Sequence, residues 1–473
     1  MELAKELLEL GKTHEALERL KHILPDFGGT QEEWKIHELI GAAFHDLGDA
    51  EGAAQACFNA AQTDTYLRSQ RSHYSNYLFL LHYLNTIDND DIAHEHLIYN
   101  NLFDNENLLS DSAFRIINSK LIIGYISPNF TESSSARFYE ALLTEYNRNE
   151  FVVKCFSLSS ESDDFTESVK ASVNKFIILE GLSIEESAEI IANENVDIIF
   201  DLGGHTDGGM TLQIMSYKPA PVQIVGIGWF DTTGLRTIDY ILTDNYLTPI
   251  GHEKYFSEKL IRMSSAFAFK PTLSMINDSA FCILHSEVNF GCFNNFMKIT
   301  DEYLKCIKKI LGKIENARFI MQDTTAIPAR KSEMEHRLKK LRLPLDRIEV
   351  RLGNDDYLDN YAEIDIMLDT FPYNGGTMTA TALYMGVPVI SLYGTRHSSR
   401  FGADILRLAG MSDLIANSNR DYVELAIKLS SDREKLNQLK QDLRKRLSIS
   451  KLLDTERFVT ELEYHYKRMV GAE

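Results

Sequence analysis

From Lys120 onward, short apolar runs alternate with helical stretches, and this alternation constrains the fold more than any other feature. The first apolar runs are LIIGYIS, FVVKCFSLS, VDIIFDLGG and PVQIVGIGW, and helical stretches such as SARFYEALLTEY and SIEESAEIIANEN lie between the earlier ones. The pattern starts again with VNFGCFNN, ARFIMQD, RIEVRL, IDIMLDT and VPVISLYG. Strands that alternate with helices and end in glycine-rich turns predict doubly wound parallel sheets. We therefore expect two consecutive α/β Rossmann-like domains, each with a ligand cleft outside the carboxyl ends of its strands.

The first hundred or so residues are dense in helix-forming residues and contain a weak internal repeat. GKTHEAL begins at Gly11 and GDAEGAA begins at Gly48, an offset of 37 residues. This offset is close to the ~34-residue period of tetratricopeptide repeats. A third, degenerate helical stretch follows at SHYSNYLFLLHYL. The pattern predicts an all-α tetratricopeptide-like domain, and a generic helical cap is the alternative.

A chain of 473 residues is long enough for about three domains. We expect a helical domain over residues 1–115, a Rossmann-like domain over 116–272 and a second over 273–473. The last helix could pack back on the first Rossmann-like domain.

Composition excludes several classes of function. The net charge of −20 disfavours nucleic acid or an anionic membrane as a partner. The sequence contains no run of about 18 apolar residues, so it predicts no membrane-spanning helix. The opening MELAKELLEL does not resemble a signal peptide. The five cysteines form no CxxC pair, which argues against a zinc site or a disulfide framework and favours the reducing cytoplasm.

The most informative segment is IDIMLDTFPYNGGTMTATALYMGVPVISLYG, residues 364–394. A strand ends at Asp369, a glycine-containing turn follows, and a helix of small residues begins near Thr377. The amides of Gly376, Thr377 and Met378 would form an anion site at the positive end of the helix dipole. By itself, a strand followed by a glycine turn and a helix is as often structural as functional. The threonines at the start of the helix (Thr377, Thr379 and Thr381) could also simply cap it.

Four long motifs, taken together, resemble the O-linked N-acetylglucosamine transferase family. They are the DTFPYNGG segment, HTDGGMTLQIMSYKPAPVQIVGIGWFDTTGLRTIDYILTD, FGCFNNFMKIT and GTRHSSRFGADIL, and they lie in the family's order within residues 120–470. The resemblance implies the two-Rossmann glycosyltransferase B (GT-B) fold, a nucleotide-sugar donor, a polypeptide acceptor held by the repeats, and no metal or other cofactor. It also implies that the first Rossmann-like domain faces the acceptor and that the second holds the nucleotide sugar. Family members use UDP-N-acetylglucosamine or, in one plant branch, GDP-fucose, so the sugar and the base remain open.

The resemblance also assigns roles to single residues on the donor side. Lys298 matches the lysine that contacts the pyrophosphate and stabilises the leaving nucleotide, although a lone lysine that opens a helix is usually a solvated charge. Asn295 matches an amide that reaches the phosphates, and Tyr357 falls where a ring can stack on the base or simply pack in the core. The remaining donor-binding positions implied are Gly375, Gly376, Thr377, Met378, Thr381 and Arg400.

His205 follows the third apolar run, and we expect it at a strand end facing the cleft. A lone histidine is more often structural, but a group that titrates near neutrality suits a general base, so His205 is the catalytic candidate beside Lys298. Three positions depart from the family. Many relatives have aspartate in place of Thr381, and animal members have histidine in place of Ser133 and Gly376. At Ser133 and Gly376, therefore, neither an acid–base role nor a sugar contact can be transferred.

The implied reaction is inverting transfer of the sugar to a serine or threonine hydroxyl, with the nucleoside diphosphate as leaving group. One alternative is a sugar-nucleotide epimerase of the same fold, and another is a non-catalytic subunit that presents acceptors to a partner enzyme. A different acceptor atom, such as asparagine nitrogen or cysteine sulfur, also remains open. The helical domain could support a homo-oligomer or a complex.

Overall fold

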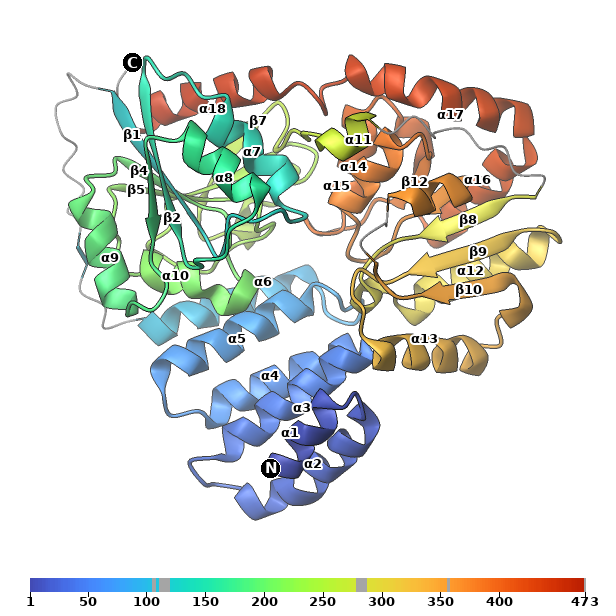
Figure 1. Ribbon diagram of the computed structural model, residues 1–473, viewed down its shortest axis with the longest axis horizontal. Coiled ribbons are helices and arrows are strands. Elements are labelled where there is room, and N and C mark those ends of the chain that lie inside the picture. Colours follow the sequence, from blue (N-terminus) through green and yellow to red (C-terminus); the bar gives the residue numbers. More distant parts are fainter. Residues whose placement is uncertain (104–107, 110–119, 278–286, 355–357, 472–473) are drawn as a thin grey trace. The chain divides into compact units, whose positions relative to one another are not determined.

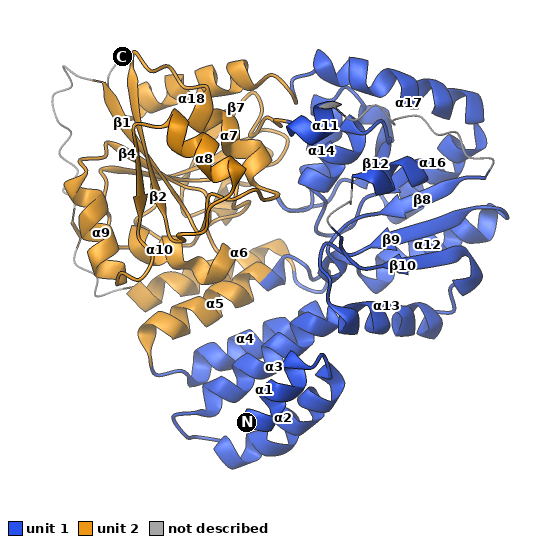
Figure 2. Ribbon diagram, in the orientation of Figure 1, with its two compact units in different colours: residues 1–65, 80–87, 271–451 blue, residues 66–79, 88–270, 452–473 orange. Residues whose placement is uncertain are grey.

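The computed structural model describes residues 1–103, 108–109, 120–277, 287–354 and 358–471. Contacts within the chain divide it into two compact units, which Figure 2 colours separately. Unit 1 contains residues 1–65, 80–87 and 271–451, and unit 2 contains residues 66–79, 88–270 and 452–473. Among the described ranges, no helix is both long enough and apolar enough to cross a membrane.

Unit 2 is built on a seven-stranded parallel sheet with the order β3-β2-β1-β4-β5-β6-β7. Figure 1 labels β1, β2, β4, β5 and β7 of this sheet. Its central strands are buried along almost their whole length, as expected where helices cover both faces of a parallel sheet. The strands are β1 (Leu121–Ser127), β2 (Phe151–Ser157), β3 (Lys175–Ile178), β4 (Ile198–Asp201), β5 (Val222–Val225), β6 (Tyr240–Asp244) and β7 (Lys259–Met263). The helices between them are α7 (Ala136–Thr144), α8 (Asp164–Ser172), α9 (Ile184–Asn193) and α10 (Met210–Met215).

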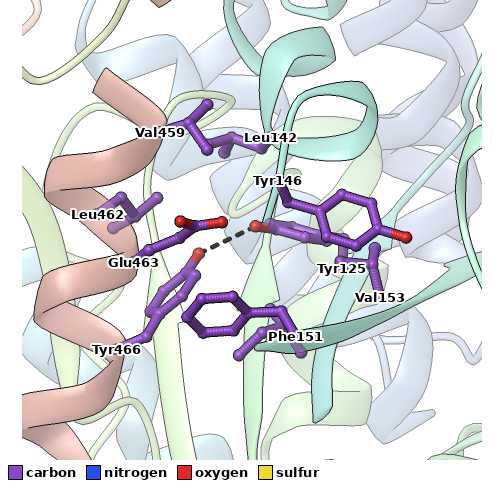
Figure 3. Close-up of a pocket in the computed structure, with 10 residues that line it drawn as sticks. Tyr125, Leu142, Tyr146, Phe151, Val153, Val459, Leu462, Glu463 and Tyr466 are labelled. Carbon is purple, nitrogen blue, oxygen red and sulfur yellow. Dashed lines mark hydrogen bonds between the residues drawn. The ribbon is translucent and has the colours of Figure 1, made fainter. Parts of the chain in front are cut away.

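The last helix of the chain, α18 (Thr455–Met469), completes the core of unit 2. Its buried face, which includes Phe458 and Leu462, packs into the cluster formed by β1, β2 and α7. Figure 3 shows Tyr466 of α18 directed toward Tyr125 of β1, and their hydroxyl oxygens are 3.1 Å apart. The C-terminal segment is therefore part of the first Rossmann-like domain in space.

Unit 1 contains the second parallel sheet, with the order β10-β9-β8-β11-β12-β13. Strand order reverses between β8 and β11, which pair directly through Phe290 and Ile366. The strands are β8 (Asn289–Cys292), β9 (Arg318–Gln322), β10 (Ile348–Arg351), β11 (Ile366–Leu368), β12 (Val389–Leu392) and β13 (Ile415–Ala416). The helices are α11 (Leu273–Asn277), α12 (Asp301–Lys313), α13 (Pro328–Lys340), α14 (Thr377–Tyr384), α15 (Phe401–Leu408), α16 (Asn419–Ser431) and α17 (Arg433–Ser448).

The chain begins with consecutive helices that form the predicted repeats. They are α1 (Glu2–Glu9), α2 (Thr13–Phe27), α3 (Glu33–Leu47), α4 (Ala50–Thr63), α5 (Leu67–Leu81) and α6 (Asn89–Tyr99). Both copies of the repeated motif lie where the second helix of a pair begins. In the second copy, Gly48 adopts a left-handed conformation (φ 72°) and the side chain of Asp49 caps α4. These turns end one helix and start the next, so they recur with the repeat.

The two compact units divide the helical segment between them, and the domain bounds expected from the sequence, with a helical domain over residues 1–115, stay a prediction. Helices α1 to α4 share a core with Ala329 at the start of α13 and belong to unit 1. Most of α5 and all of α6 belong to unit 2, where Phe79 lies 6.0 Å from Trp229 between ring centroids. The fold class is confirmed, because both sheets are parallel and follow N-terminal helical repeats.

Candidate functional site

The loops after β8 and β11 form a polar site in unit 1. These strands are neighbours at the point where strand order reverses, which is where open parallel sheets bind ligands. The loop after β8 leads to a short 3-10 turn, Phe296–Lys298, and the loop after β11 leads to α14. The FGCFNNFMKIT and DTFPYNGG motifs therefore meet at the carboxyl ends of two neighbouring strands.

Asp369 determines the conformation of the turn before α14. Its carboxylate is fully buried and accepts hydrogen bonds from the backbone amides of Thr370 (2.9 Å) and Gly375 (2.7 Å) and from the hydroxyl of Ser391 (2.7 Å). Burial raises the pKa of Asp369 to about 6. A Cβ atom at Gly375 would lie 2.9 Å from the Thr379 hydroxyl, so this position has no room for a side chain.

Lys298 contacts this turn from the β8 side. Its ammonium group donates to the carbonyl of Asn374 at 3.1 Å and lies 4.2 Å from the centroid of the Tyr373 ring. Burial lowers the pKa of Lys298 to about 8, and the nearby carboxylate of Asp369 opposes the shift. A cation is thus held beside the turn that leads into the N-terminus of α14. The first amides of a helix have no intrahelical partner, so the two features together favour an anion.

Asn295 shapes the lysine turn from within. Its side-chain oxygen accepts a hydrogen bond from the amide of Met297 (2.9 Å), and its backbone carbonyl accepts one from the amide of Lys298 (2.9 Å). The same side-chain oxygen also accepts from Arg330 at 3.2 Å. With that oxygen engaged, only the amide nitrogen of Asn295 is left to reach a phosphate.

The other predicted donor residues divide into two groups. Gly375, Gly376, Thr377 and Met378 form the turn and the first residues of α14, as expected. Thr381 and Arg400 are buried, at 0% and 4% exposed, and therefore offer almost no surface to a nucleotide. The Arg400 guanidinium donates to the carbonyls of Gly394 (2.9 Å) and Thr395 (2.8 Å), which stabilises that loop. Tyr357 lies outside the described residues.

His205 belongs to unit 2, and its surroundings do not support the general-base prediction. Its Nε2 is 3.0 Å from the carbonyl of Thr233, which can only accept, so Nε2 carries the proton. Its Nδ1 is 2.7 Å from the hydroxyl of Ser75, which then donates to it. The ring has no exposed surface, and burial together with nearby His96 holds the pKa of His205 well below its ordinary value.

The prediction placed His205 at an open cleft, and the correction has a simple physical reason. The third helix pair covers this strand end within unit 2. The His205 ring lies 4.9 Å from the rings of Tyr99 and Trp229, measured between centroids. Both ring nitrogens are engaged and the ring is neutral, so His205 joins helices to the sheet. One sequence does not show which strand ends a neighbouring helix covers, and the role of His205 as a general base stays a prediction that these contacts do not favour.

A family model described as glycosyl transferase family 41 matches residues 73–279 and 273–462. The chain belongs to glycosyl transferase family 41. Both sheets lie within the matched residues, and so do Lys298 and the turn that it contacts. The resemblance inferred from four motifs is therefore confirmed at the level of the family.

Curated family 41 relatives include plant proteins, each named a probable UDP-N-acetylglucosamine--peptide N-acetylglucosaminyltransferase. The SPINDLY protein of Petunia hybrida is 32% identical over 361 residues, which are 74% of this chain and 38% of that protein. The SEC protein of Arabidopsis thaliana is 25% identical over 74% of this chain and 37% of its own length. The chain spans about two fifths of the length of these relatives.

A solved structure with a similar fold is that of a mutant of Thermobaculum terrenum O-GlcNAc transferase. It aligns with a TM-score of 0.86 at 27% sequence identity and covers 98% of this chain and 88% of its own. The likeness extends over the helical repeats as well as both sheets. The GT-B architecture predicted from the sequence is thus confirmed.

Proposed function

We propose that the chain transfers N-acetylglucosamine from UDP-N-acetylglucosamine to serine or threonine hydroxyls of a polypeptide, with inversion and without a metal. The observation that carries the proposal is the position of Lys298, whose ammonium group contacts the turn leading into α14. The names of the plant relatives and of the Thermobaculum enzyme support the donor and the acceptor class. The family assignment supports glycosyl transfer as the reaction.

In this reaction the acceptor oxygen attacks the anomeric carbon while the bond from that carbon to the diphosphate oxygen breaks. Negative charge then grows on the departing UDP, and preorganised donors aimed at that charge lower the barrier. Lys298 and the first amides of α14 are such donors in unit 1. Both ring nitrogens of His205 are hydrogen-bonded within unit 2 and burial lowers its pKa, so we assign the proton of the acceptor hydroxyl to another group or to solvent.

The helical repeats are the proposed platform for the polypeptide. Stacked helix pairs present extended surfaces that commonly bind other polypeptides. Here the end of α3 also contacts the proposed nucleotide-binding half within unit 1, because the Arg330 guanidinium donates to the carbonyl of His45. A truncation that removes this helix would leave the buried Arg330 without its partner at His45, so acceptor binding is better tested in the full chain.

Binding of nucleotides by the full chain tests the proposal directly. A ligand present at 100 times its dissociation constant raises the free energy of unfolding by about 2.7 kcal/mol, which a thermal melt detects easily. UDP and UDP-N-acetylglucosamine should stabilise the protein more than GDP, ADP or free N-acetylglucosamine do. Release of UDP without acceptor would distinguish an enzyme from a subunit that only presents acceptors. An epimerised nucleotide sugar would instead identify the epimerase alternative.

The lowered pKa of Lys298 predicts an alkaline limit to activity. Below pH 8 the lysine is charged and can stabilise the diphosphate, and above pH 8 it loses the proton in the free enzyme. We expect kcat/KM, which reports the free enzyme, to fall up to about tenfold per pH unit above that point. This alkaline fall in kcat/KM should be absent in an active Lys298→Arg variant, because arginine stays protonated.

Stability should change in the opposite direction over the same range. The native lysine binds its proton more weakly than the unfolded one does, so burial of the charge is a cost that is fully present below about pH 8. This cost in the free energy of unfolding is relieved as pH rises from about 8 toward the ordinary pKa of lysine.

A kcat/KM that is flat to pH 10 would contradict the assignment of Lys298.

We also expect activity to survive EDTA. In metal-dependent transferases a divalent cation neutralises the leaving diphosphate, whereas here Lys298 and the amides of α14 are placed for that task. The rate of transfer should therefore stay within about twofold of its original value after exhaustive chelation. Removal of an essential metal would instead cost several kcal/mol of transition-state stabilisation and lower the rate far more. Strict dependence on added magnesium or manganese would refute this part of the proposal.

A further inference from the structure

Arg330, in α13, has no exposed surface and four hydrogen-bonding partners. One terminal nitrogen is 3.2 Å from the side-chain oxygen of Asn295, 3.2 Å from the hydroxyl of Thr325 and 3.4 Å from the carboxylate of Asp323. The other donates to the carbonyl of His45 at 2.7 Å. Burying a charge is costly even when it is paired, and an apolar side chain would fill the space at lower cost. The arrangement therefore calls for a role beyond packing.

Two of these partners hold the lysine turn directly. Asn295 accepts the amide of Met297, and the Asp323 carboxylate accepts the amide of Phe296 at 3.0 Å. Both acceptors would lose their neighbouring cation if Arg330 were removed. Arg330 thus holds in place the two side chains that bind the backbone of the three-residue turn ending at Lys298.

Another partner, His45, lies in the helical repeats. His45 is in the last turn of α3, where helix carbonyls lack intrahelical donors and the helix dipole is negative. Gly48 directly follows the last residue of α3, and a Cβ atom at this glycine would lie 3.2 Å from Cγ of Arg330. All of these residues belong to unit 1. One guanidinium group therefore contacts both the end of a repeat helix and the turn that carries the proposed leaving-group lysine.

We propose that Arg330 is a positioning residue that fixes the Lys298 turn against the end of α3, so that efficient transfer depends on the placement of the repeat helices. The inference rests on the proposed function of Lys298. It requires the planar fork of arginine, because a lysine ammonium cannot reach His45 and Asn295 from two separate nitrogens. Arg330 acts through Lys298 and touches no substrate.

Arg330→Lys in the full chain tests the inference. A shift of the lysine turn by about 1 Å should lower kcat about a hundredfold. The KM for UDP-N-acetylglucosamine should change much less, because the α14 turn remains in place. The matched control is Arg137→Lys in α7 of unit 2, since Arg137 is also buried (5% exposed) and is paired with Glu132 and Glu140. The control should lower the melting temperature in a similar way and leave kcat unchanged.

A second variant tests the helical side and leaves Arg330 in the sequence. Gly48→Ala places a methyl group against the Arg330 side chain at a left-handed position. We expect a lower kcat with UDP affinity, measured by calorimetry, close to that of the wild type. Wild-type kcat in a folded Arg330→Lys would overturn the inference. If that variant does not fold, wild-type kcat in a folded Gly48→Ala would overturn it instead. A wild-type protein that never releases UDP would count against the proposed function itself.

Discussion

Lys298→Ala should lower the rate of glycosyl transfer by about a hundredfold or more, a loss of about 3 kcal/mol in transition-state stabilisation. The lysine is the cation that contacts the carbonyl of Asn374 and the ring of Tyr373 in the turn before α14. Its charge matters most as the diphosphate departs, so kcat should fall more than the affinity for UDP does. Steady-state kinetics beside calorimetry of UDP binding would measure both.

Two further variants separate the charge from its surroundings. Lys298→Met retains an unbranched stem over Tyr373 and removes only the ammonium group, so it should be as inactive as Lys298→Ala. Lys309→Ala removes an exposed lysine from the neighbouring helix α12 and should behave as the wild type. Near-wild-type turnover by a folded Lys298→Met would show that this charge does not stabilise the leaving group.

Gly402→Ala should destabilise unit 1 by about 3 kcal/mol or more and abolish nucleotide binding. Alanine favours helix over glycine, but a Cβ atom at this position of α15 would overlap the carboxylate of Asp369 and the hydroxyl of Ser391. Both of these groups are fully buried, so neither can move away without breaking their hydrogen bond. Displacing Asp369 would also release the amides of Thr370 and Gly375.

Gly312→Ala is the matched control for this substitution. Gly312 lies in α12, and apart from its chain neighbours and the nearby backbone of that helix no atom lies within 4 Å of a Cβ built there. The change should therefore be neutral or slightly stabilising, by about 0.5 to 1 kcal/mol. Thermal melts with and without UDP would compare the two. If Gly402→Ala melted and bound UDP as the wild type does, the proposed role of Asp369 in shaping the turn would be wrong.

The sequence predicted the central strands because they are apolar along their length, and it missed the strands that are not. β1 is LIIGYIS and is almost entirely buried, so its burial is visible in its composition. β3 and β7 are edge strands, β3 with an exposed residue at each end and β7 with one at its start, and β13 has only two residues. β6 ends in a threonine and an aspartate, which hide its strand character. Short or partly exposed strands are defined by their neighbours, which a single sequence does not show.

The candidate site shows the same division between local and long-range information. The turn at residues 369–378 was recognisable because its glycines, aspartate and small-residue helix follow one another in the chain. Arg330 had no such signal, since it lies in the charged stretch PARKSEMEHRLKK, which reads as a solvated helix. Its burial comes from α3, which is nearly 300 positions away in the sequence. For the same reason the sequence did not show that helices enclose His205.

We propose that the chain moves a sugar from a nucleotide to a polypeptide. The most direct test incubates the full chain with UDP-N-acetylglucosamine and a panel of acceptor proteins. Free UDP is then measured together with the mass and position of any modification on the acceptors. We predict stoichiometric release of UDP with N-acetylglucosamine on serine or threonine, and loss of both in Lys298→Met. An unmodified acceptor panel together with an epimerised nucleotide sugar, or with no turnover of the donor, would contradict the account.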